Sequence, residues 1–189
     1  MSDAARPSFG PSALATPANA LTVLRLLATP LFVVLIVQQG ASWTTVAVGA
    51  TVAFSDGVDG WLARRQGTTR SGAFLDPLAD KVVVLGAFFT LVAEHDLPWL
   101  PVALITVREL GMSAYRSYAG RRGVSIPASS SAKLKTLVQD LAIAACLVPP
   151  LAHQHGLQLV MVWVAAGLTV ATGAQYVASG RRALRGVAT

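Results

Sequence analysis

The chain has 189 residues, of which 53% are hydrophobic and only 13% are charged. Soluble globular domains usually carry about 25% charged residues, so this composition argues against a water-soluble protein and favours one that sits in a lipid bilayer. The formal net charge is +6, which on a soluble protein would suggest a nucleic-acid partner. Here the basic residues lie between apolar runs, so we expect membrane lipids, and no nucleic acid, as the partner.

Six segments approach the length of about 20 mainly apolar residues that a membrane-spanning helix needs. Residues 1–19 contain three prolines and are expected to form a flexible N-terminal tail, and residues 181–189 a basic C-terminal tail. Residues 20–180 are expected to form one all-α membrane domain of six transmembrane helices. In chain order the predicted spans are 20–39, 42–63, 73–93, 97–119, 134–152 and 157–178.

The distribution of lysine and arginine predicts the topology. Basic residues precede the first segment and follow the second, fourth and sixth, whereas the breaks after the first, third and fifth contain none. Because cytoplasmic loops of membrane proteins carry the excess of Lys and Arg, this alternation predicts six spans with both termini in the cytoplasm. We therefore expect a multi-pass protein of the cell membrane.

Four aspartates lie around the break between the second and third segments. Asp56 and Asp59 are three residues apart, and Asp76 and Asp80 are four apart, so on helices each pair shares a face. A short basic loop joins the two segments, which predicts antiparallel neighbours whose acidic ends meet. Four carboxylates so close repel one another unless cations lie between them, and oxygen ligands favour Mg²⁺ or Mn²⁺. Two such ions are a known device for displacement at phosphorus, so we expect a two-metal site facing the cytoplasm.

The stretch from Asp56 to Asp80 resembles the signature of the CDP-alcohol phosphatidyltransferase family, Asp-x2-Asp-Gly-x2-Ala-Arg-x8-Gly-x3-Asp-x3-Asp. Every named position of that signature has its counterpart here. One departure lies in the loop, where seven residues rather than eight separate Arg64 from Gly72. The resemblance implies a six-helix membrane enzyme that transfers a phosphatidyl group from CDP-diacylglycerol to an alcohol.

By this resemblance, each motif residue has an expected role. All four aspartates would face the metal ions, and Asp80 would also act as the general base on the acceptor hydroxyl, which is a poor nucleophile without one. The family is commonly homodimeric, so the resemblance also implies a homodimer. The residues expected to contact the CDP part are Asp56, Gly60, Ala63, Arg64 and Arg70.

Four basic residues near the cytoplasmic side of the fourth and fifth segments favour a phosphorylated acceptor. They offer a second phosphate site, separate from the pyrophosphate of the donor. Basic residues in these positions can also serve simply as topology anchors, which is the alternative for the two lysines. The residues assigned to the acceptor phosphate are Arg108, Arg116, Lys133 and Lys135.

Further stretches between about residue 19 and residue 150 resemble the branch of the family that joins glycerol 3-phosphate to CDP-diacylglycerol, giving phosphatidylglycerophosphate and CMP. One of them contains Asn19, Thr22 and Arg25, which are possible cavity-lining residues. The stretch Ser131-Ala132-Lys133 departs from this pattern, because a glycine often precedes the first lysine of that stretch in the branch.

Other functions remain open at this point. A related enzyme could use another acceptor, either phosphatidylglycerol, to give cardiolipin, or inositol phosphate. A membrane prenyltransferase also holds Mg²⁺ and a pyrophosphate with aspartates, but it needs two Asp-rich motifs on distant helices, whereas here all four acids lie within residues 56–80. A divalent-cation transporter could also use an acidic site, but it would release no CMP.

Overall fold

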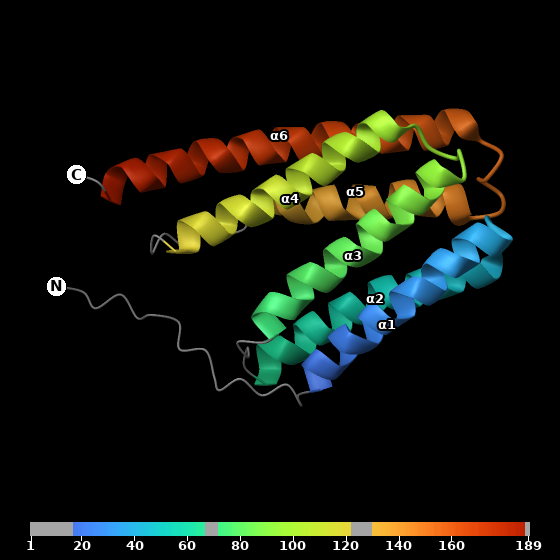
Figure 1. Ribbon diagram of the computed structural model, residues 1–189, viewed down its shortest axis with the longest axis horizontal. Coiled ribbons are helices and arrows are strands. Elements are labelled where there is room, and N and C mark those ends of the chain that lie inside the picture. Colours follow the sequence, from blue (N-terminus) through green and yellow to red (C-terminus); the bar gives the residue numbers. More distant parts are fainter. Residues whose placement is uncertain (1–16, 67–71, 122–129, 188–189) are drawn as a thin grey trace. The chain divides into compact units, whose positions relative to one another are not determined.

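The computed structural model describes the backbone of residues 17–66, 72–121 and 130–187, and the side chains of residues 20–55, 78–118 and 134–178. Over these backbone ranges the chain forms helices joined by short turns, with no strand (Figure 1). The helices are α1 (Pro17–Gln39), α2 (Trp43–Gln66), α3 (Gly72–Ala93), α4 (Trp99–Arg121), α5 (Ser130–Leu147) and α6 (His155–Val187). The prediction of an all-α chain with six helices is confirmed for this part of the chain.

The chain forms two compact units, Met1–Ala87 and Phe88–Thr189. In the first unit α1 packs along α2, and the side chain of Phe32 on α1 lies against the backbone of α2 at Gly49. A β-carbon at Gly49 would lie 2.8 Å from Cε2 of Phe32 on α1, so no larger residue fits there without displacing that ring. The first part of α3 also contacts α1, because a β-carbon at Gly86 would lie 3.7 Å from Cγ2 of Val33.

The α1 helix has its polar side chains buried and its apolar side chains exposed. Thr22, Arg25 and Thr29 follow one another at spacings of three and four residues, and all three are buried. On the opposite side Leu24 is 61% exposed and Leu27 is 71% exposed. In water this arrangement would be unfavourable, whereas in lipid it is the expected one, since polar groups of a membrane helix face the protein interior. The burial pattern therefore supports the membrane assignment.

In the second unit α6 packs against both α4 and α5. Apolar residues such as Ile105, Ala142 and Val162 are fully or almost fully buried between them. One buried hydrogen bond also joins α5 to α6, in which Gln139 Nε2 donates to Thr169 Oγ1 at 2.9 Å. These contacts fix the three helices as the frame on which the polar residues of this unit are placed.

The largest differences between the observed helix bounds and the predicted segments are at the ends of α5 and α6. The fifth segment was predicted to run to residue 152, but α5 ends at Leu147 because Pro149 lacks the N–H that would continue the helix. The sixth segment was predicted to end at residue 178, but α6 continues to Val187, through most of the expected C-terminal tail. Among the described residues, two stretches are long and apolar enough to cross a membrane, Ala20–Gln39 and His155–Ala178.

Candidate functional site

The aspartate motif lies on the last turns of α2 and the first turns of α3. Asp56 and Asp59 belong to α2, and Asp76 and Asp80 belong to α3. Because both segments are helical, each pair occupies one face of its helix, as the spacing predicted. Of the four side chains only that of Asp80 lies within the described part of the structure, where it is partly exposed. The convergence of all four carboxylates therefore stays a prediction.

The predicted CDP contacts fall largely outside the described side chains. Gly60, Ala63 and Arg64 lie on the helical backbone of α2, but their side chains are outside the described ranges. Arg70 lies in the connection 67–71, which is outside them altogether.

The donor set fits a divalent metal by its chemistry. Two helical turns present carboxylates at neighbouring positions, and carboxylate oxygens are the ligands that Mg²⁺ and Mn²⁺ prefer. Among the side chains that the structure describes, no three His, Cys, Asp or Glu residues form a metal-binding group, and only Asp80 of the motif is in that set. That the four motif aspartates hold the metal ions stays a prediction from the sequence.

A buried arginine on α1 contacts α2 directly next to the motif. Arg25 Nε donates a hydrogen bond to Ser55 Oγ at 3.2 Å, and Ser55 immediately precedes Asp56. Thr22 lies one turn earlier on the same buried face, whereas the side chain of Asn19 is outside the described residues. The structure thus places Thr22 and Arg25 on the side of α1 that faces its neighbours, and that they line a cavity stays a prediction.

Two of the four residues assigned to the acceptor phosphate come together in the second unit. Oε1 of Glu109 on α4 accepts hydrogen bonds from Nη1 of Arg108 at 2.8 Å and from Nζ of Lys135 on α5 at 2.5 Å. Nη2 of Arg108 also donates to Oγ1 of Thr172 on α6 at 3.1 Å. Arg108, Glu109, Lys135 and Thr172, which we call the α4–α6 ion cluster, thus join three helices.

The other two assigned residues do not add to this cluster within the described part of the structure. Arg116 is exposed, and its guanidinium carbon lies 5.1 Å from the ring centroid of Tyr176 in a cation–π contact. Tyr176 in turn meets Tyr115 edge to face, with centroids 6.2 Å apart. The side chain of Lys133 lies outside the described residues.

Glu109 and Thr172 were not predicted from the sequence as site residues. Thr172 carries no signal in the sequence, because threonine is common in helices of this kind. Glu109 did carry one, since an acid in the middle of an apolar segment is expensive to bury and normally has a cationic partner. Arg108 and Lys135 were assigned to the acceptor phosphate, whereas Glu109, whose carboxylate joins them, was assigned no role.

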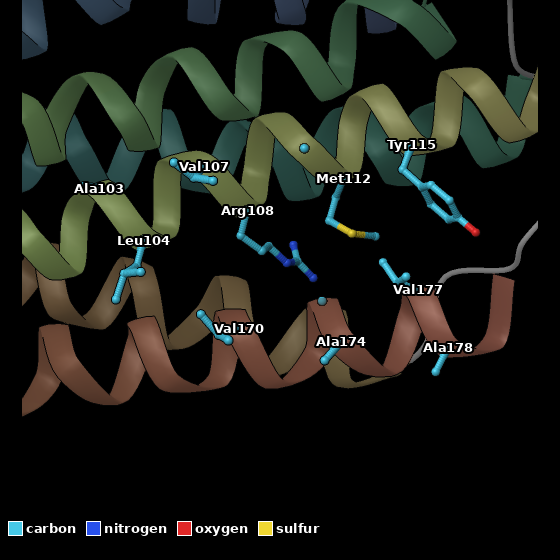
Figure 2. Close-up of a pocket in the computed structure, with 12 residues that line it drawn as sticks. Ala103, Leu104, Val107, Arg108, Met112, Tyr115, Val170, Ala174, Val177 and Ala178 are labelled. Atoms are coloured by element: carbon cyan, nitrogen blue, oxygen red, sulfur yellow. The ribbon is translucent and has the colours of Figure 1, made fainter. Parts of the chain in front are cut away.

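Arg108 also lines an open apolar groove between α4 and α6, with a volume of about 820 Å³ (Figure 2). The arginine side chain extends from α4 toward α6, where a β-carbon at Gly173 would lie 3.1 Å from its Cγ and Nε. Nε is buried and has no hydrogen-bond partner among the described residues. The groove is lined by Ala103, Leu104, Val107, Arg108, Gly111, Met112, Tyr115, Val170, Gly173, Ala174, Val177 and Ala178.

The sequence of the chain is similar to known proteins of one family. A family model described as CDP-alcohol phosphatidyltransferase matches residues 15–171. A probable phosphatidylglycerophosphate synthase of Mycobacterium tuberculosis is 40% identical over 184 residues, covering 94% of this chain and 88% of that protein. Two proteins named CDP-diacylglycerol–glycerol-3-phosphate 3-phosphatidyltransferase also match. The one from Pseudomonas fluorescens is 38% identical over 84% of this chain and 86% of its own, and the one from Escherichia coli K12 is 37% identical over 85% and 92%.

Proposed function

The chain belongs to the CDP-alcohol phosphatidyltransferase family, and on that basis we propose that it transfers a phosphatidyl group from CDP-diacylglycerol to glycerol 3-phosphate. The products are phosphatidylglycerophosphate and CMP. The observation that carries the proposal is the complete aspartate signature on α2 and α3, in a chain whose relatives named for this reaction match it over more than four fifths of its length.

In the proposed reaction the hydroxyl oxygen of the acceptor attacks the phosphorus that carries the diacylglycerol group. The bond between that phosphorus and the oxygen bridging it to CMP breaks, and CMP leaves. Asp80 takes the proton of the attacking hydroxyl, a role that contributes about 10²–10⁴-fold in enzymes of known mechanism. When bound by Asp56, Asp59, Asp76 and Asp80, a pair of Mg²⁺ or Mn²⁺ ions supplies charge neutralisation for the phosphates of the donor.

The α4–α6 ion cluster favours a phosphorylated alcohol as the acceptor. Arg108 and Lys135 bring two cations to one point inside the second unit, which suits the phosphate of glycerol 3-phosphate and gives a neutral alcohol nothing to pair with. Arg116 and Lys133 complete the proposed phosphate site from the cytoplasmic ends of the same helices. On α2, Gly60, Ala63 and Arg64, together with Arg70 in the connection, bind the CDP part of the donor.

The proposed setting is the cell membrane, with six spans, both termini in the cytoplasm and the active site facing the cytoplasm. The buried polar stripe of α1 and the two stretches that can span a bilayer support a membrane location. The absence of basic residues from the first, third and fifth breaks of the sequence supports the topology. A homodimer is proposed from the family alone.

A direct assay tests the proposal. Purified protein in mixed micelles is given CDP-diacylglycerol, Mg²⁺ and radiolabelled glycerol 3-phosphate, and both labelled lipid and CMP are measured. We expect equal amounts of the two products. The Asp80→Asn variant should still bind CDP-diacylglycerol but lose turnover by about 10²–10⁴-fold.

Two results would contradict the proposal in different ways. Product with phosphatidylglycerol or inositol phosphate, but none with glycerol 3-phosphate, would assign the chain to another branch of the family. No CMP with any acceptor would argue against a transferase and in favour of a cation transporter.

A further inference from the structure

We propose that Glu109 is a positioning residue for the acceptor phosphate: its carboxylate holds Arg108 and Lys135 together so that both cations meet the phosphate. The inference rests on the proposed transfer to a phosphorylated alcohol. It adds a residue of opposite charge to a site that otherwise consists of cations.

The geometry singles out one oxygen atom. Oε1 of Glu109 accepts from Nη1 of Arg108 at 2.8 Å and from Nζ of Lys135 at 2.5 Å. The two cations come from different helices, α4 and α5, and they meet only through this atom among the hydrogen bonds described for them. Two long basic side chains have many rotamers, so a shared anion removes much of the freedom that a phosphate would otherwise have to restrict.

Because Glu109 is buried, its negative charge as well as its position keeps the two cations together. Glu109 is 9% exposed and Lys135 is 7% exposed, so water screens their interaction poorly. Without the carboxylate, two positive charges would face each other at close range and would move apart. The three side chains together carry a net charge of +1, which still favours an incoming phosphate dianion.

The rest of the cluster fixes Arg108 from the other side. Its Nη2 donates to Oγ1 of Thr172, which itself bonds the carbonyl of Leu168 at 2.8 Å, and its Cγ and Nε lie against the backbone of Gly173. The guanidinium is therefore held by α6 and by Glu109 at once. Loss of Glu109 leaves Arg108 held by α6 alone and removes the atom that Arg108 shares with Lys135, so the pair loses its common position.

The test compares Michaelis constants of the full-length enzyme for its two substrates. Glu109→Gln keeps the size of the side chain and removes its charge. We expect KM for glycerol 3-phosphate to rise at least tenfold, while KM for CDP-diacylglycerol changes less than twofold. Glu109→Asp keeps the charge on a shorter side chain and should give an intermediate KM for glycerol 3-phosphate, which is a partial rescue.

A double-mutant cycle shows whether Glu109 acts through Lys135. Lys135→Gln should itself raise KM for glycerol 3-phosphate, and adding Glu109→Gln to it should raise KM by less than Glu109→Gln does in the wild-type enzyme, because one of the two cations that Glu109 positions is already gone. The double variant also removes the lysine that Glu109→Gln alone would leave without this carboxylate. Additive effects of the two substitutions would overturn the inference.

A matched control separates positioning from support of the fold. Thr169→Val removes the hydroxyl that accepts the buried hydrogen bond from Gln139, which joins α5 to α6. The substitution keeps the backbone carbonyl of Thr169, the atom that accepts from Thr172 of the ion cluster at 3.1 Å. It should lower the melting temperature but leave the ratio of the two KM values unchanged. If Glu109→Gln behaves like this control, or changes both KM values equally, Glu109 is structural and the inference is wrong. A wild-type enzyme that makes no lipid from glycerol 3-phosphate would instead refute the proposed function itself.

Discussion

Two glycines of α6 provide a matched test of how tightly Arg108 is packed. A β-carbon at Gly173 would lie 3.1 Å from both Cγ and Nε of Arg108, whereas one at Gly167 would meet no heavy atom within 4 Å. Arg108 cannot retreat easily, because Glu109 and Thr172 both bind its guanidinium. The Gly173→Ala substitution therefore forces a contact that Gly167→Ala does not.

The expected difference follows from two terms. Both substitutions gain about 1 kcal/mol from the better helix propensity of alanine. Only Gly173→Ala adds an overpacking cost, typically about 1–3 kcal/mol. Gly173→Ala should therefore be less stable than Gly167→Ala by about 1–3 kcal/mol, which for a chain of this length is about 2–12 °C in melting temperature.

Thermal unfolding of the two variants in the same detergent measures this difference. The displaced arginine should also raise KM for glycerol 3-phosphate in Gly173→Ala and not in Gly167→Ala. Equal melting temperatures would show that α4 and α6 are not packed through Arg108 and Gly173 as described, and the reasoning about the ion cluster would lose its support on the α6 side.

The remaining predictions concern the metal site, the α1–α2 contact and the end of α3. Chelation with EDTA should abolish CMP release, and added Mg²⁺ or Mn²⁺ should restore it; activity that survives chelation would contradict the two-metal site. Ser55→Ala leaves the buried Arg25 without this acceptor and should lower stability by about 1.5–3 kcal/mol, measured by unfolding in detergent, with an unchanged melting temperature as the contrary result. His95→Gly should raise stability by about 1 kcal/mol, because His95 has a φ of 65° and only glycine adopts that region without strain. His153→Gly, in a turn without positive φ, is the control and should bring no such gain.

The end of α3 illustrates why His95 is strained. The amide of Asp96 donates to the carbonyl of Leu91 at 2.9 Å, and the amide of His95 donates to the carbonyl of Val92 at 3.2 Å. This pair of bonds is the Schellman arrangement, which requires a left-handed residue at the position of His95. The corresponding residue after α1 is Gly40, with a φ of 55°.

The six helices were predictable from the sequence because apolar runs of membrane length are separated by short polar breaks. The end of α5 was missed because the apolar run continues past Pro149, so hydropathy does not mark the point where the backbone loses a donor. The aspartate motif was found because its spacing is local, and the helices observed at Asp56 and Asp80 agree with that spacing.

The ion cluster was only half predictable. Arg108 and Lys135 were singled out by charge, but their meeting at Glu109 depends on how α4 and α5 pack, and spacing within one segment carries no information about that. Charge alone also did not predict that the Arg116 guanidinium lies over the ring of Tyr176, and its role at the acceptor phosphate stays a prediction. Contacts between distant helices are set by the fit of whole surfaces, which the pattern of a single sequence does not encode.

The inward polar stripe of α1 also bears on how the chain is inserted during synthesis. An isolated α1 would expose Arg25 to hydrocarbon, at about 2.5–3.5 kcal/mol on insertion scales. One partner of this arginine, Ser55, lies in the middle of α2, which begins only a few residues after α1 ends. The hairpin of α1 and α2 therefore brings a hydrogen-bond acceptor to Arg25 as soon as both helices are in the bilayer.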